Sequence, residues 1–293
     1  MDKTVIGCDI GGTKIRIGKF DGTSISRLIS FKISDMSPES LMWELGGYIL
    51  RNCPEGVCAL SLGIAGTLSR DGRCLLKTPN LPAMENAPLA EMLENSLGVP
   101  VFLDNDINVL LRADAHLLGL PKRGLLLGVY VGTGLGVAVF LDGAPLPGKN
   151  GISEIGHMPI AGRRDLCTCG NRGCAENYVS GRYLQSLRVG SFPETPIERL
   201  FTEHAENPAL LRFVDELAAV TAGALNLLDP QTLVMGGGVC SMRDFPRESF
   251  AKLLYDYAMK PVPADTLDLR WSPGDSSAGV LGAALIAMEK LAR

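Results

Sequence analysis

The first third of the chain alternates short apolar runs with glycine turns. Thr4–Asp9 is apolar and leads into Gly11-Gly12, and Lys14–Phe20 alternates apolar and polar residues up to Asp21-Gly22. Such runs between glycine turns predict β-strands joined in hairpins, whereas apolar residues that recur every three or four positions predict helices. By these rules we expect further strands at Ser26–Ile33, Val57–Ile64 and Val101–Leu103, and helices at Pro38–Asn52, Leu89–Leu97 and Asp106–Leu118.

The same order of features returns after residue 124. Leu125–Val131 is apolar and ends in Gly132-Thr133-Gly134, Leu135–Leu141 follows, and Asp142-Gly143 turns the chain again. We expect later strands at Thr232–Met235 and Thr266–Trp271, and helices at Pro208–Leu228, Phe245–Met259 and Ala278–Leu291. A repeated unit followed by alternating strands and helices predicts two related α/β lobes. We assign residues 1–118 and the C-terminal helix 278–293 to a small lobe, and residues 119–277 to a large one.

The composition is that of an ordinary globular protein, with 46% hydrophobic and 20% charged residues in a chain of 293. The net charge is −4 and no basic patch stands out, which argues against a nucleic-acid partner. No apolar run reaches the roughly 18 residues of a membrane span, and the chain starts directly with a strand, which leaves no room for a signal peptide. The cysteines outside one cluster show no paired spacing. We therefore expect a cytoplasmic protein.

That cysteine cluster lies between Glu154 and Glu176. Three of the eight cysteines fall within eight residues there, ten residues after a histidine. The candidate ligands are His157, Cys167, Cys169 and Cys174. One imidazole and three thiolates form a closed tetrahedral set, which is typical of structural Zn²⁺. The alternative is a group of buried thiols beside a core histidine, but Gly170 and Gly173 favour a tight knuckle around one ion.

Three glycine turns follow apolar strands. They read DIGGTK at 9–14, GTGLG at 132–136 and GGG at 236–238. Glycine lets the backbone approach a ligand closely, and successive amides bind phosphate oxygens. Asp9, at the tip of its strand, would hold Mg²⁺ through the water shell of the ion. Any one turn could be a simple hairpin, but the set predicts nucleotide binding. None of them is a P-loop or a dinucleotide fingerprint.

A polar segment, DNDIN at 104–108, follows another predicted strand. Asp104 is expected to cap the following helix. Asn105 and Asp106 supply an amide and a base at the carboxyl end of the strand. Phosphoryl transfer to an alcohol needs a base that faces the hydroxyl, a metal that neutralises the phosphates, and good alignment. The side chains suited to binding sugar hydroxyls are Asn80, Asn105, Asp106, Glu154, His157 and Glu176.

Taken together, these motifs resemble the ROK family of sugar kinases and sugar-responsive repressors, within the actin–hexokinase superfamily. The matching segments are DIGGTK at 9–14, TPN at 78–80, DNDIN at 104–108, GTGLG at 132–136, EIGH at 154–157, CTCGNRGCAE at 167–176 and GGG at 236–238. The resemblance implies a two-lobed α/β fold of the actin/hexokinase (ribonuclease H-like) kind with a cleft between the lobes. It also implies transfer of phosphate from ATP to the 6-hydroxyl of a hexose.

By position, the resemblance makes Asp106 the catalytic base. It implies sugar contacts from Asn80, Asn105, Asp106, Glu154, His157 and Glu176. It implies zinc ligation by His157, Cys167, Cys169 and Cys174. It implies contacts to ATP and its Mg²⁺ from Asp9, Gly11, Gly12, Thr13, Lys14, Gly132, Thr133, Gly134, Gly236 and Gly237. Many members of the family are dimers, so a homodimer is implied as well.

One position departs from the family pattern, because Ser153 stands where the residue before the Glu of EIGH is usually glycine. Its Cβ could shift Glu154 and alter hydroxyl recognition. Within the family, segments 141–148, 204–208 and 226–248 resemble those of kinases that act on D-allose, which implies D-allose 6-phosphate as product. Kinases for glucose, fructose, N-acetylmannosamine or N-acetylglucosamine are the alternatives. A repressor is disfavoured, because only eight residues precede Asp9 and leave no space for a DNA-reading helix-turn-helix.

Overall fold

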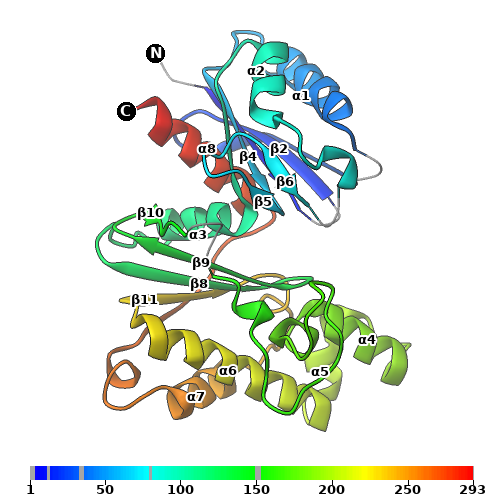
Figure 1. Cartoon of the computed structure of the whole chain (residues 1–293), viewed down its shortest axis with the longest axis vertical. Coiled ribbons are helices and arrows are strands. Elements are labelled where there is room, and N and C mark those ends of the chain that lie inside the picture. Colours follow the sequence, from blue (N-terminus) through cyan, green and yellow to red (C-terminus); the bar gives the residue numbers. More distant parts are fainter. Residues whose placement is uncertain (1–3, 12–13, 33–35, 79–80, 149–152, 293) are drawn as a thin grey trace. The chain divides into compact units, whose positions relative to one another are not determined.

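The computed structural model describes residues 4–11, 14–32, 36–78, 81–148 and 153–292. The chain divides into two compact units (Figure 1). The first comprises Met1–Leu120, Pro147–Gly151 and Pro273–Arg293, and the second comprises Pro121–Leu146 and Ile152–Ser272. A five-stranded sheet forms the centre of each unit.

The sheet of the first unit has the strand order β3-β2-β1-β4-β7. Strands β1, β4 and β7 run parallel, and β2 and β3 extend the sheet as an antiparallel hairpin. The strands are β1 Val5–Ile10, β2 Lys14–Phe20, β3 Ile25–Lys32, β4 Ala59–Ile64 and β7 Val101–Asn105; a small separate sheet contains β5 Thr67–Leu68 and β6 Leu75–Lys77. The helices are α1 Pro38–Asn52, α2 Leu89–Leu97, α3 Asp106–Leu117 and α8 Ala278–Leu291.

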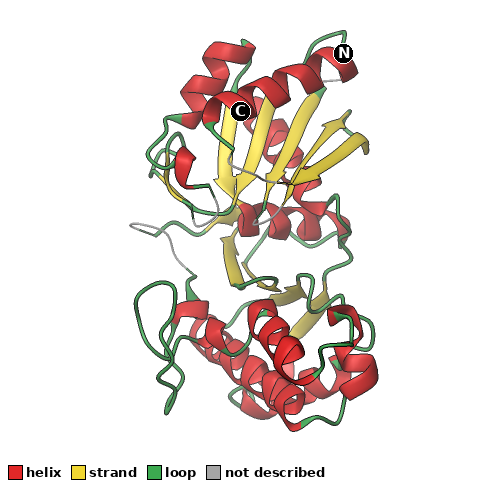
Figure 2. Ribbon diagram, turned by 90° about the vertical axis from the view of Figure 1, so that its right-hand side faces the viewer, coloured by secondary structure: helices red, strands yellow, loops and turns green. Residues whose placement is uncertain are grey.

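Alternate side chains of β1 enter two different cores of this unit. Ile6, Cys8 and Ile10 pack with α1 and α2, whereas Val5 packs with α8. Figure 2 shows helices on both faces of this sheet. Helix α8 approaches β1 very closely, since a Cβ placed on Gly7 would overlap the carbonyl of Val280. The alternation also turns Asp9, two residues beyond Gly7, towards α8.

The second unit repeats this arrangement with the strand order β10-β9-β8-β11-β12. Strands β8, β11 and β12 are parallel, and β9 and β10 are antiparallel additions. The strands are β8 Leu125–Val131, β9 Leu135–Leu141, β10 Ala144–Pro145, β11 Thr232–Gly236 and β12 Asp268–Trp271. The helices are α4 Gly181–Ser191, α5 Leu200–His204, α6 Pro208–Leu228 and α7 Arg247–Tyr257. Aromatic side chains from Phe201, Phe213, Phe245, Phe250 and Trp271 form part of the core of this unit.

The elements match the sequence pattern closely, with a few differences at their ends. Strand β7 continues to Asn105, and α7 begins at Arg247 rather than Phe245 because Pro246 comes directly before its first turn. Two helices that we did not predict, α4 and α5, lie in the segment after the cysteine cluster. No helix in the described part of the chain is both long and apolar enough to cross a membrane.

Candidate active site

Asp9, at the end of β1, is held by an arginine of the neighbouring strand. Arg16 on β2 lies directly opposite Asp9 in the hairpin register, and its Nη1 donates to Asp9 Oδ2 at 2.9 Å. The Asp9 side chain is 13% exposed. Burial raises the pKa of this carboxyl, while the charge and hydrogen bond of Arg16 oppose the rise. Arg16 therefore favours the ionised form that a metal site requires.

The amino-terminal end of α8 lies against the same carboxylate. A Cβ on Gly279, the second residue of α8, would come within 2.5 Å of Asp9 Cγ. The first amides of a helix carry partial positive charge and favour a nearby anion. Asp9 therefore lies between a guanidinium group and a helix N-terminus, at a position that only glycine at 279 leaves open.

The segment 104–106 joins the end of β7 to the start of α3. Asn105 caps α3, since its Oδ1 accepts a hydrogen bond from the amide of Ile107 at 2.9 Å. Asp104 Oδ1 instead accepts from Asn108 Nδ2 and the Asn105 amide, both at 2.8 Å. Our assignment of the cap to Asp104 is therefore wrong by one residue. Burial raises the pKa of Asp104, and these hydrogen bonds oppose the rise.

Asp106, the expected base, is the first residue of α3 and is half-buried. Its Oδ1 accepts from the Ile107 amide at 3.0 Å. A carboxylate in the first turn is stabilised by the partial positive charge of the helix end. Its neighbour Asn105 donates through Nδ2 to the carbonyl of Gly66 at 3.2 Å. The expected base thus lies at the carboxyl end of β7, where Asp106 and Asn105 form hydrogen bonds with the backbone of Ile107 and Gly66.

Three turns of the first unit share one edge of the sheet. In the parallel register, Asp9 pairs with Gly63, and Gly63 pairs with Asp104. Two strand spacings therefore separate the Asp9 and Asp104 backbones, about 10 Å. The turn after β4 also contacts the TPN segment, because Thr78 Oγ1 donates to the Ala65 carbonyl at 2.8 Å. The carboxylates expected to act on metal and hydroxyl thus lie at the same strand ends.

In the second unit, the two glycine turns lie side by side. The Val239 amide, just after GGG, donates to the Val131 carbonyl at the end of β8 at 2.9 Å. Gly237 has a φ of +90°, and a Cβ there would meet the same carbonyl at 2.5 Å. The start of α4 joins them, since the Gly181 amide donates to the Gly132 carbonyl at 2.8 Å. Two glycine turns and a helix N-terminus therefore meet, as in many phosphate sites.

Glu176 connects the cysteine segment to the GTGLG turn. Its Oε2 accepts from the Leu135 amide at 3.1 Å, and a Cβ on Gly134 would overlap the same oxygen. Arg182 Nη1 lies 3.7 Å from Oε1. The Glu176 side chain is 14% exposed, so it lies beneath the turn rather than out in solvent. In the structure, Glu176 supports this turn.

The four candidate zinc ligands converge. One ligand atom from each of His157, Cys167, Cys169 and Cys174 lies within 4.8 Å of the others. The Cys169 and Cys174 sulfurs are 3.7 Å apart, and Cys167 Sγ is 3.6 Å from His157 Nδ1. Burial, and then the hydrogen bond with Cys169, raises the pKa of Cys174 to about 12. These influences favour the neutral thiol at Cys174, whereas a bound cation would favour the thiolate, and one imidazole with three cysteine sulfurs is a donor set that fits Zn²⁺.

The geometry of His157 separates its two predicted roles. Nδ1 faces the sulfur cluster, while Nε2 lies 4.0 Å from Glu154 Oε2. The Glu154 carboxylate is 79% exposed. One ring nitrogen is thus placed for a metal, and the other points to the side where Glu154 could bind a ligand. The knuckle itself is anchored by Arg163, which pairs with Glu216 on α6 and lies 4.5 Å above the Tyr178 ring.

The ROK family model matches residues 5–290 of this chain. The chain belongs to the ROK family. It is 28% identical to the glucokinase of Thermotoga maritima, with 98% of both chains covered. It is 31% identical to the N-acetyl-D-glucosamine kinase of Vibrio cholerae, covering 96% of this chain and 98% of that one. Its structure is similar to the ROK hexokinase of Thermus thermophilus, with a TM-score of 0.80, 29% identity and 99% of both chains covered.

The ROK assignment confirms the resemblance read from the sequence and the actin/hexokinase type of fold. Several expected ROK residues, Gly12, Thr13 and Asn80, lie outside the described residues. Of the remaining residues expected to contact the nucleotide, Gly11 and Lys14 close the first turn, since the Gly11 amide donates to the Lys14 carbonyl at 3.1 Å. Gly236 ends β11 next to Gly237. Arg16, Gly279 and Arg182 were missed by the sequence analysis.

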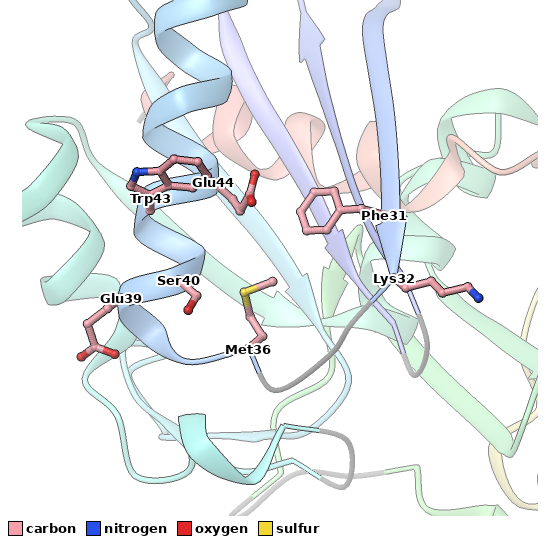
Figure 3. Close-up of a pocket in the computed structure, with 7 residues that line it drawn as sticks. All are labelled: Phe31, Lys32, Met36, Glu39, Ser40, Trp43 and Glu44. Carbon is pink, nitrogen blue, oxygen red and sulfur yellow. The ribbon is translucent and has the colours of Figure 1, made fainter.

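A surface pocket of the first unit is separate from these ROK motifs. Its lining comes from the end of β3 and from α1 (Figure 3). The lining residues are Phe31, Lys32, Met36, Glu39, Ser40, Trp43 and Glu44. None of them is an expected sugar, nucleotide or metal contact. Among the described residues of this unit, the expected site residues are Asp9, Gly11, Lys14, Asn105 and Asp106.

Proposed function

We propose that this chain transfers the γ-phosphoryl group of ATP to the 6-hydroxyl of a hexose, with D-allose as its substrate. The enzyme class, a hexokinase-type ATP:sugar phosphotransferase, is that of the full-length relatives, and it is the class of this chain. Our proposal adds the position of the hydroxyl, the identity of the sugar and the roles of individual residues.

One observation carries the residue assignment. The ends of β1 and β7 bring Asp9 and the 104–106 segment to one edge of the same sheet. Phosphoryl transfer needs a carboxylate near the metal–phosphate group and another near the attacking hydroxyl. The backbones of Asp9 and Asp104 are about 10 Å apart, which leaves room for the metal–phosphate group and the sugar hydroxyl between the Asp9 and Asp106 side chains. This arrangement supports separate roles, with Asp9 near the metal and Asp106 near the attacking hydroxyl.

In this mechanism Asp106 accepts the proton of the sugar hydroxyl as its oxygen attacks the γ-phosphorus. The bond from phosphorus to the β,γ-bridging oxygen breaks, and ADP leaves with that oxygen. Mg²⁺, when bound, neutralises charge on the phosphates, and Asp9 would hold its water shell. Arg16 favours the ionised form of Asp9. The amides of the glycine turns and the start of α4 would contact phosphate oxygens.

The sugar would be held by the side chains of Asn105, Asp106, Glu154, His157 and Glu176, together with Asn80. A structural zinc on His157 Nδ1 and the three cysteines would fix the EIGH segment, since that nitrogen faces the sulfur cluster. His157 Nε2 and Glu154 would then remain available for hydroxyl groups. A metal that acts in this way organises the sugar site without taking part in the transfer.

An N-acetylhexosamine is the second candidate substrate. The observation in its favour is the 31% identity to the N-acetyl-D-glucosamine kinase of Vibrio cholerae. Sugars that differ at one stereocentre or one acetamido group differ in few contacts, so the scaffold alone does not discriminate between them.

The test is an assay of ADP release with ATP and a panel of D-allose, glucose, mannose, fructose, N-acetylglucosamine and N-acetylmannosamine. The proposal expects the highest kcat/KM for D-allose and a product phosphorylated at the 6-position, which nuclear magnetic resonance of the product identifies. A higher kcat/KM for any other sugar of the panel would contradict the allose assignment. A product phosphorylated elsewhere would contradict the proposed position.

A further inference from the structure

Ser153 adopts a backbone conformation that its side chain disfavours. Its φ is +76°, in the left-handed region where glycine is favoured because a Cβ crowds the following carbonyl. It comes directly before Glu154 and the short turn Ile155–His157. The residue thus holds the entry to the EIGH segment in a strained form.

The hydroxyl of Ser153 is unfavourable for a second reason. Its Oγ is buried and has no hydrogen-bond partner among the residues that the structure describes. A buried hydroxyl without a partner is less stable than the same group in water. Glycine would remove both unfavourable features, and alanine would remove the second. The structure therefore gives no reason of stability for serine at this position.

The adjacent side chain, Glu154, has no close hydrogen-bond donor among the described residues. The Glu154 carboxylate is 79% exposed, and His157 Nε2 is 4.0 Å from it, beyond hydrogen-bond distance. The following residues are better fixed, because the His157 amide donates to the Glu154 carbonyl at 3.0 Å and the His157 ring faces Cys167. Within the described part of the chain, a donor without an acceptor and a carboxylate without a close donor are therefore sequence neighbours.

We propose that Ser153 is a positioning residue for Glu154 and thereby determines sugar specificity. When a hexose binds, the Glu154 carboxylate turns from solvent towards the sugar, and Ser153 Oγ donates a hydrogen bond to it. A carboxylate held in one orientation accepts hydrogen bonds from the hydroxyls at one pair of ring positions. It binds epimers less well, because their hydroxyls point in other directions. This inference rests on the proposed role of Glu154 in sugar binding.

The experiment compares Ser153→Gly and Ser153→Ala with the unaltered chain in the ADP-release assay over the sugar panel. Both variants are expected to raise KM for the best sugar about fivefold to tenfold, to leave kcat within about twofold, and to reduce the kcat/KM ratio of best to second sugar about tenfold. Ser153→Gly is also expected to raise Tm more than Ser153→Ala, because only glycine relieves the left-handed conformation. Unchanged KM and unchanged discrimination in both variants would overturn the proposal.

Ser61 offers a matched control, because its buried Oγ in β4 also lacks a partner among the described residues. Ser61→Ala should change Tm without changing the sugar ratio. A double-mutant cycle with Glu154→Ala, which removes the acceptor, should show that the Ser153→Ala effect on KM disappears in that background, and additive effects would contradict the coupling. Failure of the proposed function can be distinguished from failure of the Ser153 inference. In the first case, the unaltered chain would release no sugar-dependent ADP with any sugar of the panel.

Discussion

Arg16 Nη1 donates to Asp9 Oδ2 at 2.9 Å between two residues that face each other across the β1–β2 hairpin. The pair connects the first glycine turn to the strand that follows it. Because Asp9 is largely buried, the arginine compensates a charge that would otherwise be poorly solvated. The ionisation of the proposed metal carboxylate thus depends on a neighbour that no motif in the sequence indicated.

Replacing Arg16 should shift the acid limb of the pH profile. Burial raises the pKa of Asp9, and Arg16 is the main influence that lowers it. In Arg16→Met the pKa should rise further, so that activity is lost at a higher pH as the pH falls. We expect kcat/KM at neutral pH to fall on the order of tenfold, with partial recovery at higher pH. Arg16→Lys, which keeps the charge, is the control, and a pH profile unchanged in Arg16→Met would contradict this role.

A methyl group at position 279 should displace Asp9. The Cβ of Gly279→Ala would come within 2.5 Å of Asp9 Cγ, at the start of α8. We expect this variant to lose about 1–3 kcal/mol of unfolding free energy through overpacking, and most of its activity. Gly223→Ala in α6 is the matched control, since a Cβ there has no heavy atom within 4 Å. That control should gain about 1 kcal/mol, measured by urea unfolding, and keep its activity.

Removal of one thiol should release the proposed zinc. Metal analysis of the purified chain should find about one zinc per molecule, and Cys174→Ser should lower this value and raise KM for the sugar more than KM for ATP. The reason is that the ligand His157 belongs to the same segment as Glu154. Cys58→Ser, which changes an exposed cysteine outside the cluster, is the control. Full activity in a zinc-free chain would show that the four side chains of the cluster only pack against one another.

The sequence predicted most of the fold because its elements carry local signals. Helix α1 begins at Pro38 after the capping Ser37, and α6 begins at Pro208 after the capping Asn207, so their starts can be read from short segments. Helix α4 also has a capping residue, Ser180, but glycine stands at its first position and again at position 190, and these residues weaken the local helical signal. It is stabilised by contacts to the GTGLG turn, which are tertiary and cannot be read from its own residues.

The candidate site shows the same limit. The two roles of His157 were inferred together from the sequence, but only the structure shows which ring nitrogen faces the sulfurs. The pair of Arg163 and Glu216 links residues 53 positions apart, which no local pattern reveals. In contrast, the Asp9–Arg16 pair lies in a short hairpin, and its register could have been read by counting back from the turn. The departure at Ser153 was visible in the sequence, but its positive φ was not.

The proposed phosphoryl transfer depends most on Asp106 as the base that receives the hydroxyl proton. The decisive measurement compares kcat with sugar affinity in Asp106→Asn, using ADP release for the first and calorimetric binding of the best sugar for the second. Asparagine keeps the size of the side chain and its position at the start of α3 but cannot accept the proton. We predict that kcat falls about 10²–10⁴-fold while the sugar Kd changes less than about fivefold. A kcat close to that of the unaltered chain would contradict the account.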